Sequence, residues 1–224
     1  MSEVIITVRG EHEARLAPEE GVARLSARAE GPERAVVVDE VATRSAPLRD
    51  GLSAREVAGA VREWSSQRVS VWANRPWNSD GTQLPLVHYA AVEFTATFTD
   101  FAALAEWLTD TAAVDGVQID GVHWRLSAAT ARSAEAEVAA SAVRVAVERA
   151  TAYAAAIDRS TVTPLEIADL GLLTPPSAPG GHEVMRMAKA SFASDALGGD
   201  SGALALQPED IVVTAAVEAR FSAR

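Results

Sequence analysis

The sequence predicts an α+β fold in which antiparallel sheet packs against helices. Three observations lead to this prediction. Stretches that alternate apolar and polar residues, as half-buried strands do, occur near both ends of the chain and in its middle. Apolar residues at helical spacing fill the stretches between them. The 224 residues are 48% hydrophobic and 23% charged, which supplies a sizeable core, and we expect a single domain over residues 1–224.

Charge and composition argue against several classes of partner and site. Lys and Arg number 20 against 31 Asp and Glu, so the net charge is −11 and the field around the chain repels phosphate backbones. We therefore expect no nucleic-acid partner. Cysteine is absent, which removes disulfides, thiolate zinc sites and thiol nucleophiles. No run of about 18 apolar residues predicts a membrane span, and no secretion signal is visible, so we expect a cytoplasmic protein.

The first third of the chain predicts two strands, two helices and a third strand. Residues 4–16 and 21–31 alternate, and the turn residues between them predict a hairpin. Helical spacing follows from Pro32 to Ala46, and a second, short helix is expected after Gly51. Residues 65–78 then alternate as a strand up to a breaker.

The middle of the chain shows a strand, a helix and a strand. Residues 84–98 place apolar side chains on one face, which His88 shares. Thr99 or Asp100 caps a helix over 101–114. The next strand, 116–128, directs Trp124 toward the core and places His123 and Arg125 on the opposite face.

The last hundred residues predict a long helix, a strand, a long loop and a closing strand. Ser127, Thr130 or Ser133 caps the helix, which extends to Ile157. Its packing face is predicted to comprise Ala139, Ala142, Ala146, Ala150, Tyr153 and Ile157. The strand follows at 163–173. Residues 174–207, rich in Gly, Pro and Ser, are expected to form a flexible loop or assembly arm. The closing strand, 209–223, is expected to share a sheet system with the amino-terminal hairpin.

Four segments resemble the SIMPL domain family. They are "IITVRGEHEARLAPE" at 5–19, "YAAVEFTATFTDFAALAEWLTDTAAVDGVQIDGVHWRLS" at 89–127, "AEAEVAASAVRVAVERATAYAAAI" at 134–157 and "PEDIVVTAAVEARF" at 208–221. Together they cover nearly the whole chain, through patterned apolar and small residues without a chemical signature. The resemblance implies an α+β domain, assembly into higher oligomers as in some bacterial relatives, and a link to envelope or oxidative stress. It implies no enzymatic site. Most bacterial relatives look exported, whereas this sequence shows no signal peptide.

No catalytic, cofactor-binding or metal-binding residue is predicted. The four histidines form no local pair at metal-ligand spacing, and the chain has no Gly-rich phosphate loop and no nucleophile elbow. His123 and Arg125, facing Glu93 or Glu218 of a neighbouring strand, are interpreted as cross-strand charge pairing. The alternative is a small-ligand site or an uncharacterised enzyme on the polar sheet face around His88, His123 and Arg125.

Four residues are candidates for an interface with a second copy or another protein. Trp77 is expected at a loop tip, where an exposed aromatic ring is available for contact, whereas Trp72 is expected in the core. Met185, Met187 and Phe192 provide adaptable apolar side chains in the long loop. We therefore expect a non-enzymatic protein that acts through self-assembly or protein partners.

Overall fold

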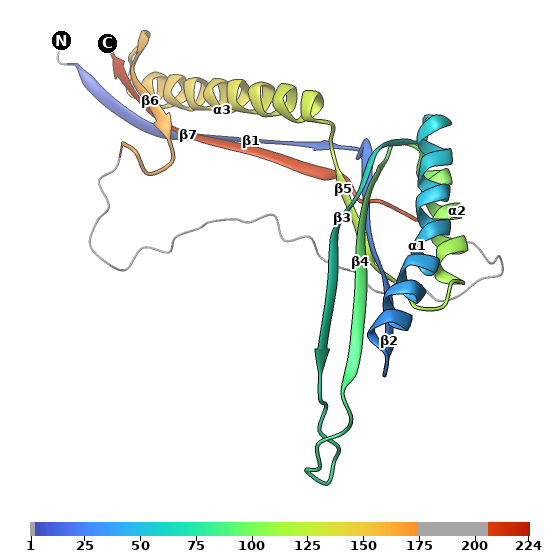
Figure 1. The fold of residues 1–224 in the computed structure, drawn as a ribbon. Helices are drawn as coiled ribbons and strands as arrows, with labels where there is room; N and C mark the ends of the chain where they lie inside the picture. The colour runs from blue at the N-terminus through green and yellow to red at the C-terminus, as the bar shows by residue number, and fades with distance from the viewer. Residues whose placement is uncertain (1–2, 174–205) are drawn as a thin grey trace. The chain divides into compact units, whose positions relative to one another are not determined.

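The computed structural model describes residues 3–173 and 206–224, and it confirms the α+β class with two antiparallel sheets and three helices among these residues (Figure 1). Nearly all of the predicted loop or assembly arm at 174–207 lies outside the described residues. The described residues form two compact units. The first unit contains residues 3–17, 126–173 and 210–224, and the second contains 18–125 and 206–209. One domain over the whole chain stays a prediction.

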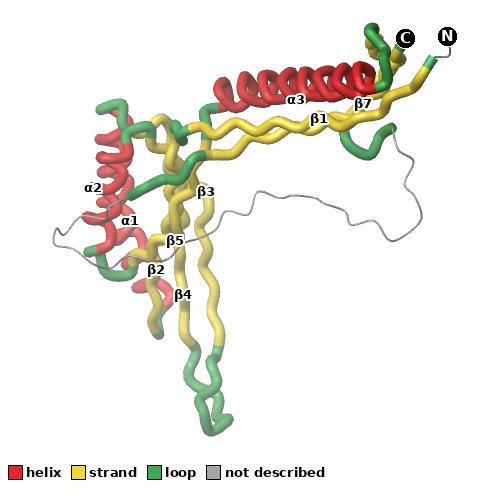
Figure 2. Tube along the Cα trace, turned by 180° about the vertical axis from the view of Figure 1, so that it is seen from behind, coloured by secondary structure: helices red, strands yellow, loops and turns green. Residues whose placement is uncertain are grey.

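The first unit is a three-stranded sheet covered by one helix. The strands are β1 (Val4–Leu16), β6 (Val162–Asp169) and β7 (Ile211–Ala223), in the order β1-β7-β6. β1 and β7 pair along all 13 residues of each, and they run side by side in Figures 1 and 2. Helix α3 (Ala128–Ala156) begins at the cap Ser127, whose hydroxyl accepts from the backbone N–H of Thr130. The predicted sheet that joins the closing strand to the amino-terminal strands is confirmed for residues 4–16 and is wrong for residues 21–31, which lie in the other sheet.

The packing face of α3 differs from the prediction at both ends. Ala142, Ala146 and Ala150 are buried against the sheet as expected. Ala139, Tyr153 and Ile157 are exposed, because the buried row continues instead through Val138 and Ala154 at spacings of four. The contact is close: a Cβ added at Gly10 of β1 would lie 2.0 Å from the carbonyl oxygen of Ala142. Glycine is therefore required where the strand crosses the helix.

The second unit is a four-stranded sheet with two helices on one face. Its strands are β2 (Glu20–Gly31), β3 (Val61–Asn74), β4 (Val87–Phe98) and β5 (Val117–Arg125), in the order β3-β4-β2-β5. Helices α1 (Arg34–Val57) and α2 (Phe101–Ala112) cover the face that carries Ala23, Leu25 and Phe94. The predicted alternation of β4 is confirmed from Ala90 to Phe98. None of the described helices has the length and apolarity needed to cross a membrane.

The predicted hairpin of the first two strands is wrong. β1 pairs with β7 in one sheet, whereas β2 pairs with β4 and β5 in the other. Residues 17–19, within the predicted turn, therefore connect two sheets. The backbone explains this, because the N–H of Glu19 donates to the carbonyl of Arg125 and Glu20 already pairs with β5. A turn signal shows that the chain changes direction but does not identify the next partner strand.

The two predicted helices after Pro32 are one. α1 runs through Pro47 and Gly51 because a single buried row continues on both sides of the proline. The row consists of Val37, Val41, Ser45, Leu48 and Leu52. Burial of this row offsets the cost of an interior proline. α2 begins at Asp100, whose carboxylate accepts from the N–H groups of Ala102 and Ala103 as a helix cap does.

Candidate functional site

A charged cluster lies on the face of the four-stranded sheet opposite α1 and α2, which we call the polar sheet face. Glu20, only 2% exposed, accepts from Arg125 Nε at 2.7 Å through one carboxylate oxygen and from Arg62 through the other. Arg62 and Arg125 also contact Glu63 Oε1, at 3.0 and 3.5 Å. Each oxygen of the buried Glu20 carboxylate thus accepts a hydrogen bond from a guanidinium group.

The side chains of this charged cluster hold the ends of neighbouring strands together. Its members come from the ends of β2, β3, β4 and β5, with Thr97 Oγ1 accepting from Arg125 at 3.4 Å. Arg62 beside Glu63 holds the pKa of that carboxyl below its ordinary value, mainly through a hydrogen bond and then through charge. Guanidinium groups stay protonated, so they provide neither a general acid nor a general base at neutral pH. The arrangement supports stabilisation of the sheet.

Replacing the buried carboxylate tests this role. Glu20→Gln should lower the free energy of unfolding by about 1–3 kcal/mol, because two guanidinium groups lose their charged acceptor while remaining partly hydrated. Urea unfolding measures the change. Glu63→Gln is the matched control in the same cluster, and it should change the unfolding midpoint far less because Glu63 is exposed. Equal effects of the two substitutions would contradict a special role for Glu20.

The structure does not bring the three residues of the predicted ligand site together. His123 lies opposite Val22, which lies opposite Thr97 of β4. His88 precedes Thr97 by nine positions (97 − 88), a separation of about 30 Å along the strand. His88 also lies on the sheet face that α1 and α2 cover, with its Nδ1 buried and without a hydrogen-bond partner among the described residues.

The predicted partners of Arg125 are wrong. Arg125 pairs with Glu20 and Glu63, whereas Glu93 pairs with Arg68 and Glu218 with Arg9. The cause is the sheet order, since β5 neighbours β2 and not β4 or β7. Cross-strand pairing of Arg125 is confirmed, with different residues. His123 is exposed beside it.

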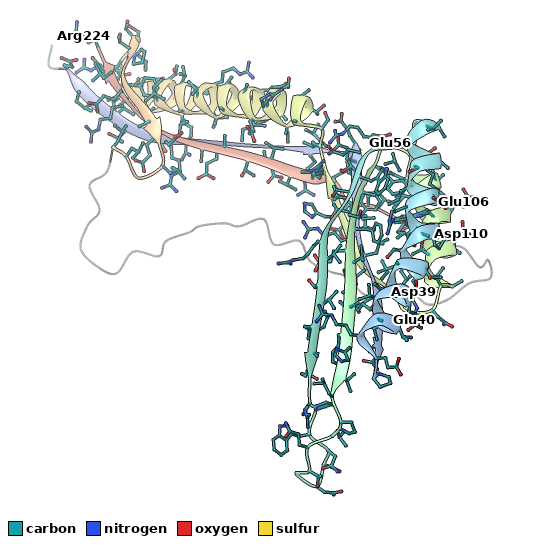
Figure 3. The ribbon with its side chains drawn as sticks, in the orientation of Figure 1. Asp39, Glu40, Glu56, Glu106, Asp110 and Arg224 are labelled. Carbon is teal, nitrogen blue, oxygen red and sulfur yellow. The ribbon has the colours of Figure 1, made fainter. Side chains whose placement is uncertain are left out.

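The described residues hold no group of three or more acidic or histidine side chains arranged for a metal ion. His12 is exposed on β1, and His182 lies outside the described residues. Figure 3 labels acidic side chains on α1 and α2, and several of them have structural partners. Glu40 pairs with Arg44, Asp110 with Arg55, and Glu56 accepts from the Trp64 indole at 3.1 Å.

Two shallow hollows lie along the first half of α1, away from the polar sheet face. One is lined by residues of the helix itself, including Arg34, Val38 and Asp39. The other lies at the connection between the end of β2 and the start of α1, and Gly31 and Pro32 form part of its wall. Neither contains a residue of the predicted ligand site.

The second candidate region is the distal half of the β3–β4 hairpin, residues 68–89, which we call the arm. It projects past the helices that cover the sheet (Figures 1 and 2). Trp77 lies in its tip loop and is 67% exposed. The tip is an ordered turn, because Asn78 Oδ1 accepts from the N–H groups of Asp80 and Thr82 at 3.1 and 2.7 Å. The predicted exposure of Trp77 at a loop tip is confirmed.

Trp72 is not a core residue, contrary to the prediction. It lies opposite Tyr89, on the sheet face without helices, and its ring stacks on the Tyr89 ring at 5.4 Å. The prediction failed because alternation gives the face of a strand but not which face the helices cover. The arm carries further exposed apolar side chains that sequence analysis missed, namely Val69, Leu84 and Leu86. Met185, Met187 and Phe192 lie outside the described residues.

The model of the SIMPL family, described as a protein of unknown function (DUF541), matches residues 6–221. No protein in a search of curated sequences matches the chain.

Proposed function

The chain belongs to the SIMPL family, and from that premise we propose that it acts by binding other protein chains, including its own copies, without catalysing a reaction. A stress-related role, which the family resemblance implies, is part of the same proposal. The observation that supports it is the arm. An apolar surface of this kind is characteristic of contact sites, and Trp is among the residues that contribute most to protein interfaces.

The ordered conformation of the tip loop supports a role of the exposed Trp77 in binding. Leu84 donates its N–H to the Pro76 carbonyl at 2.8 Å, and Asn78 donates to the Thr82 carbonyl at 3.0 Å. These bonds hold the loop that presents Trp77. A preformed loop loses less conformational entropy when it meets a partner. The arm also contains few charges, with Arg68, Arg75 and Asp80 as its only Lys, Arg, Asp or Glu residues.

A binding or catalytic site for a small ligand has less support. Such sites combine a concave cavity with a few convergent polar groups. The two hollows along α1 contain none of His88, His123 and Arg125. The buried carboxylate of Glu20 is already satisfied by two arginines. These observations favour the interaction proposal.

Association should depend on the arm tip. Light scattering over a concentration series should show a mass above that of one chain, and Trp77→Ser should lower the association because an exposed indole loses its contact. Val57→Ser is the control, since Val57 is 90% exposed at the end of α1 in the same unit. If both variants associate like the original chain, Trp77 is not part of the interface, and the strand residues of the arm together with Met185, Met187 and Phe192 are the remaining candidates. A single-chain mass at every concentration, together with no partner in a pull-down, would contradict the proposal.

A further inference from the structure

The two sheets have four edge strands among the described residues, namely β1 and β6 in one sheet and β3 and β5 in the other. An edge strand exposes unpaired backbone groups, and proteins protect such edges with proline, bulges or charges. β6 has Pro164 and a register shift beside it. β5 has a bulge where Arg24 meets Gly121. Both devices interrupt pairing with an added strand.

β1 is protected by charge. Its exposed face carries Arg9, Glu11, Glu13 and Arg15, and the helix side chain Arg149 donates to the Arg9 carbonyl at 2.8 Å. A further strand at this edge would have to displace that guanidinium. The proximal half of β3 is protected as well, by two register shifts and by the charged pair Arg62 and Glu63.

The distal half of β3 lacks these devices. Residues 68–74, "RVSVWAN", pair with β4 in unbroken register from Arg68 opposite Glu93 to Asn74 opposite Val87. The segment has one charge, no proline and no glycine, and most of its residues are exposed. Val, Ser and Trp in alternation give it the composition of a strand that joins a sheet. It is the one edge of this kind among the described strands.

We infer that residues 68–74 pair antiparallel with the same residues of a second copy, so that the β3-β4-β2-β5 sheets of the two copies join edge to edge into one continuous sheet. The inference rests on the proposed function and specifies its partner and surface. A two-fold axis between the two paired strands places even-numbered residues opposite even-numbered residues and odd opposite odd. The corresponding faces of the two copies then point to the same side of the joined sheet. The register that centres Ser70 on the axis places Arg68 opposite Trp72 of the other copy and Val69 opposite Val71.

This register is self-complementary on both faces. Arg68 and Trp72 share the polar sheet face, so each guanidinium meets the indole of the other copy, a favourable cation–π pair. Val69 and Val71 share the other face and form two apolar cross-strand pairs. Val69, which is 64% exposed in the single chain, would be covered. One sequence thus supplies both halves of the contact, which argues for a second copy rather than a foreign peptide.

The charge of the arm supports the same partner. The whole chain carries a net charge of −11, so two copies repel each other over most of their surface. The arm has two arginines and one aspartate, so arm-to-arm contact keeps acidic surface apart. Salt screens the remaining repulsion, and association should therefore strengthen as ionic strength rises.

A cysteine at the axis tests the register, because the chain has none of its own. Ser70→Cys should form a disulfide-linked dimer under mild oxidation, since paired Cβ atoms in antiparallel strands lie about 4.5–5.5 Å apart. Ser79→Cys is the control in the exposed tip loop of the same arm. The two copies of residue 79 would be about 60 Å apart in this arrangement, at nine residues from the axis on each side. Linkage of both variants alike, or of neither, would overturn the register.

A charge at the edge tests the surface. Val69→Lys should weaken association by about tenfold or more, because a lysine would be buried against Val71 of the other copy. Val57→Lys makes the same change at an exposed valine of the same unit and should leave the mass unchanged. Circular dichroism must show both variants folded. If the chain associates and Val69→Lys has no effect, this inference fails while the proposed function stands. If the original chain never associates and captures no partner, both fail.

Discussion

A chain that ends at residue 207 should lose the folded structure of the first unit. The truncation removes β7, which is the central strand of the β1-β7-β6 sheet and pairs with both neighbours. It also removes the apolar residues Val217, Ala219 and Phe221 from the core beneath α3. Loss of a single buried Phe side chain costs about 3–5 kcal/mol, against a total stability of about 5–15 kcal/mol for a whole domain.

Amide hydrogen exchange measures this result segment by segment. Protection in β1 and α3 should disappear in the truncated chain, and Val212→Ser, an exposed change in the same strand, should keep it. Protection of β2 and β4 also tests the prediction of one domain. If the second unit keeps its protection, the two units fold separately, and if it loses protection the chain folds as one cooperative domain. An unchanged melting curve would contradict the central role of β7.

Gly10→Val should destabilise the first unit nearly as strongly. Even the first added carbon would lie 2.0 Å from the Ala142 carbonyl oxygen and 2.7 Å from the Ala146 backbone nitrogen. Backbone atoms of a helix cannot rotate away as a side chain can, so α3 must shift along its contact with β1. We expect a loss of at least about 3 kcal/mol, toward the upper end of overpacking effects.

Urea unfolding with a probe of helix content measures this loss. Thr7→Val is the control, because it also introduces a valine into the same strand but replaces only a hydroxyl by a methyl group, on the face away from α3. That variant should stay within about 0.5 kcal/mol of the original chain. A Gly10→Val chain as stable as the control would show that α3 does not need its close approach to β1.

The elements of the fold could be predicted from the sequence, whereas their pairing could not. Alternation around Phe94 and Phe221 reflects burial on one face, and burial is a local property of each strand. The separation of β1 from β2 depends on the competing partner β7, which lies about two hundred residues along the chain from β1. Helix α1 continues through Pro47 because Leu48 and Leu52 are buried beyond it, and this depends on the sheet below.

The candidate sites show the same division. The turn at Pro76 and Trp77 depends on neighbouring residues alone. The exposed position of Trp77 at the hairpin tip could therefore be predicted correctly from the sequence. Pairing of Glu20 with Arg125 joins residues 105 positions apart, so it requires the order of the strands before it can be inferred. Trp72 was misplaced for the same reason, since only the positions of α1 and α2 decide which face is open.

The long pairing of β1 with β7 has a mechanical consequence. Val4 lies opposite Ala223, so the two ends of the chain lie at the same end of a ladder that continues to Leu16 opposite Ile211. Figures 1 and 2 show both ends together. A force that pulls residues 4 and 223 apart acts on one pair at a time, in a zipper geometry, because antiparallel hydrogen bonds lie across the strands and along the pull. The first unit should therefore open at low force from its ends and resist far more strongly when the same strands are pulled lengthwise past each other.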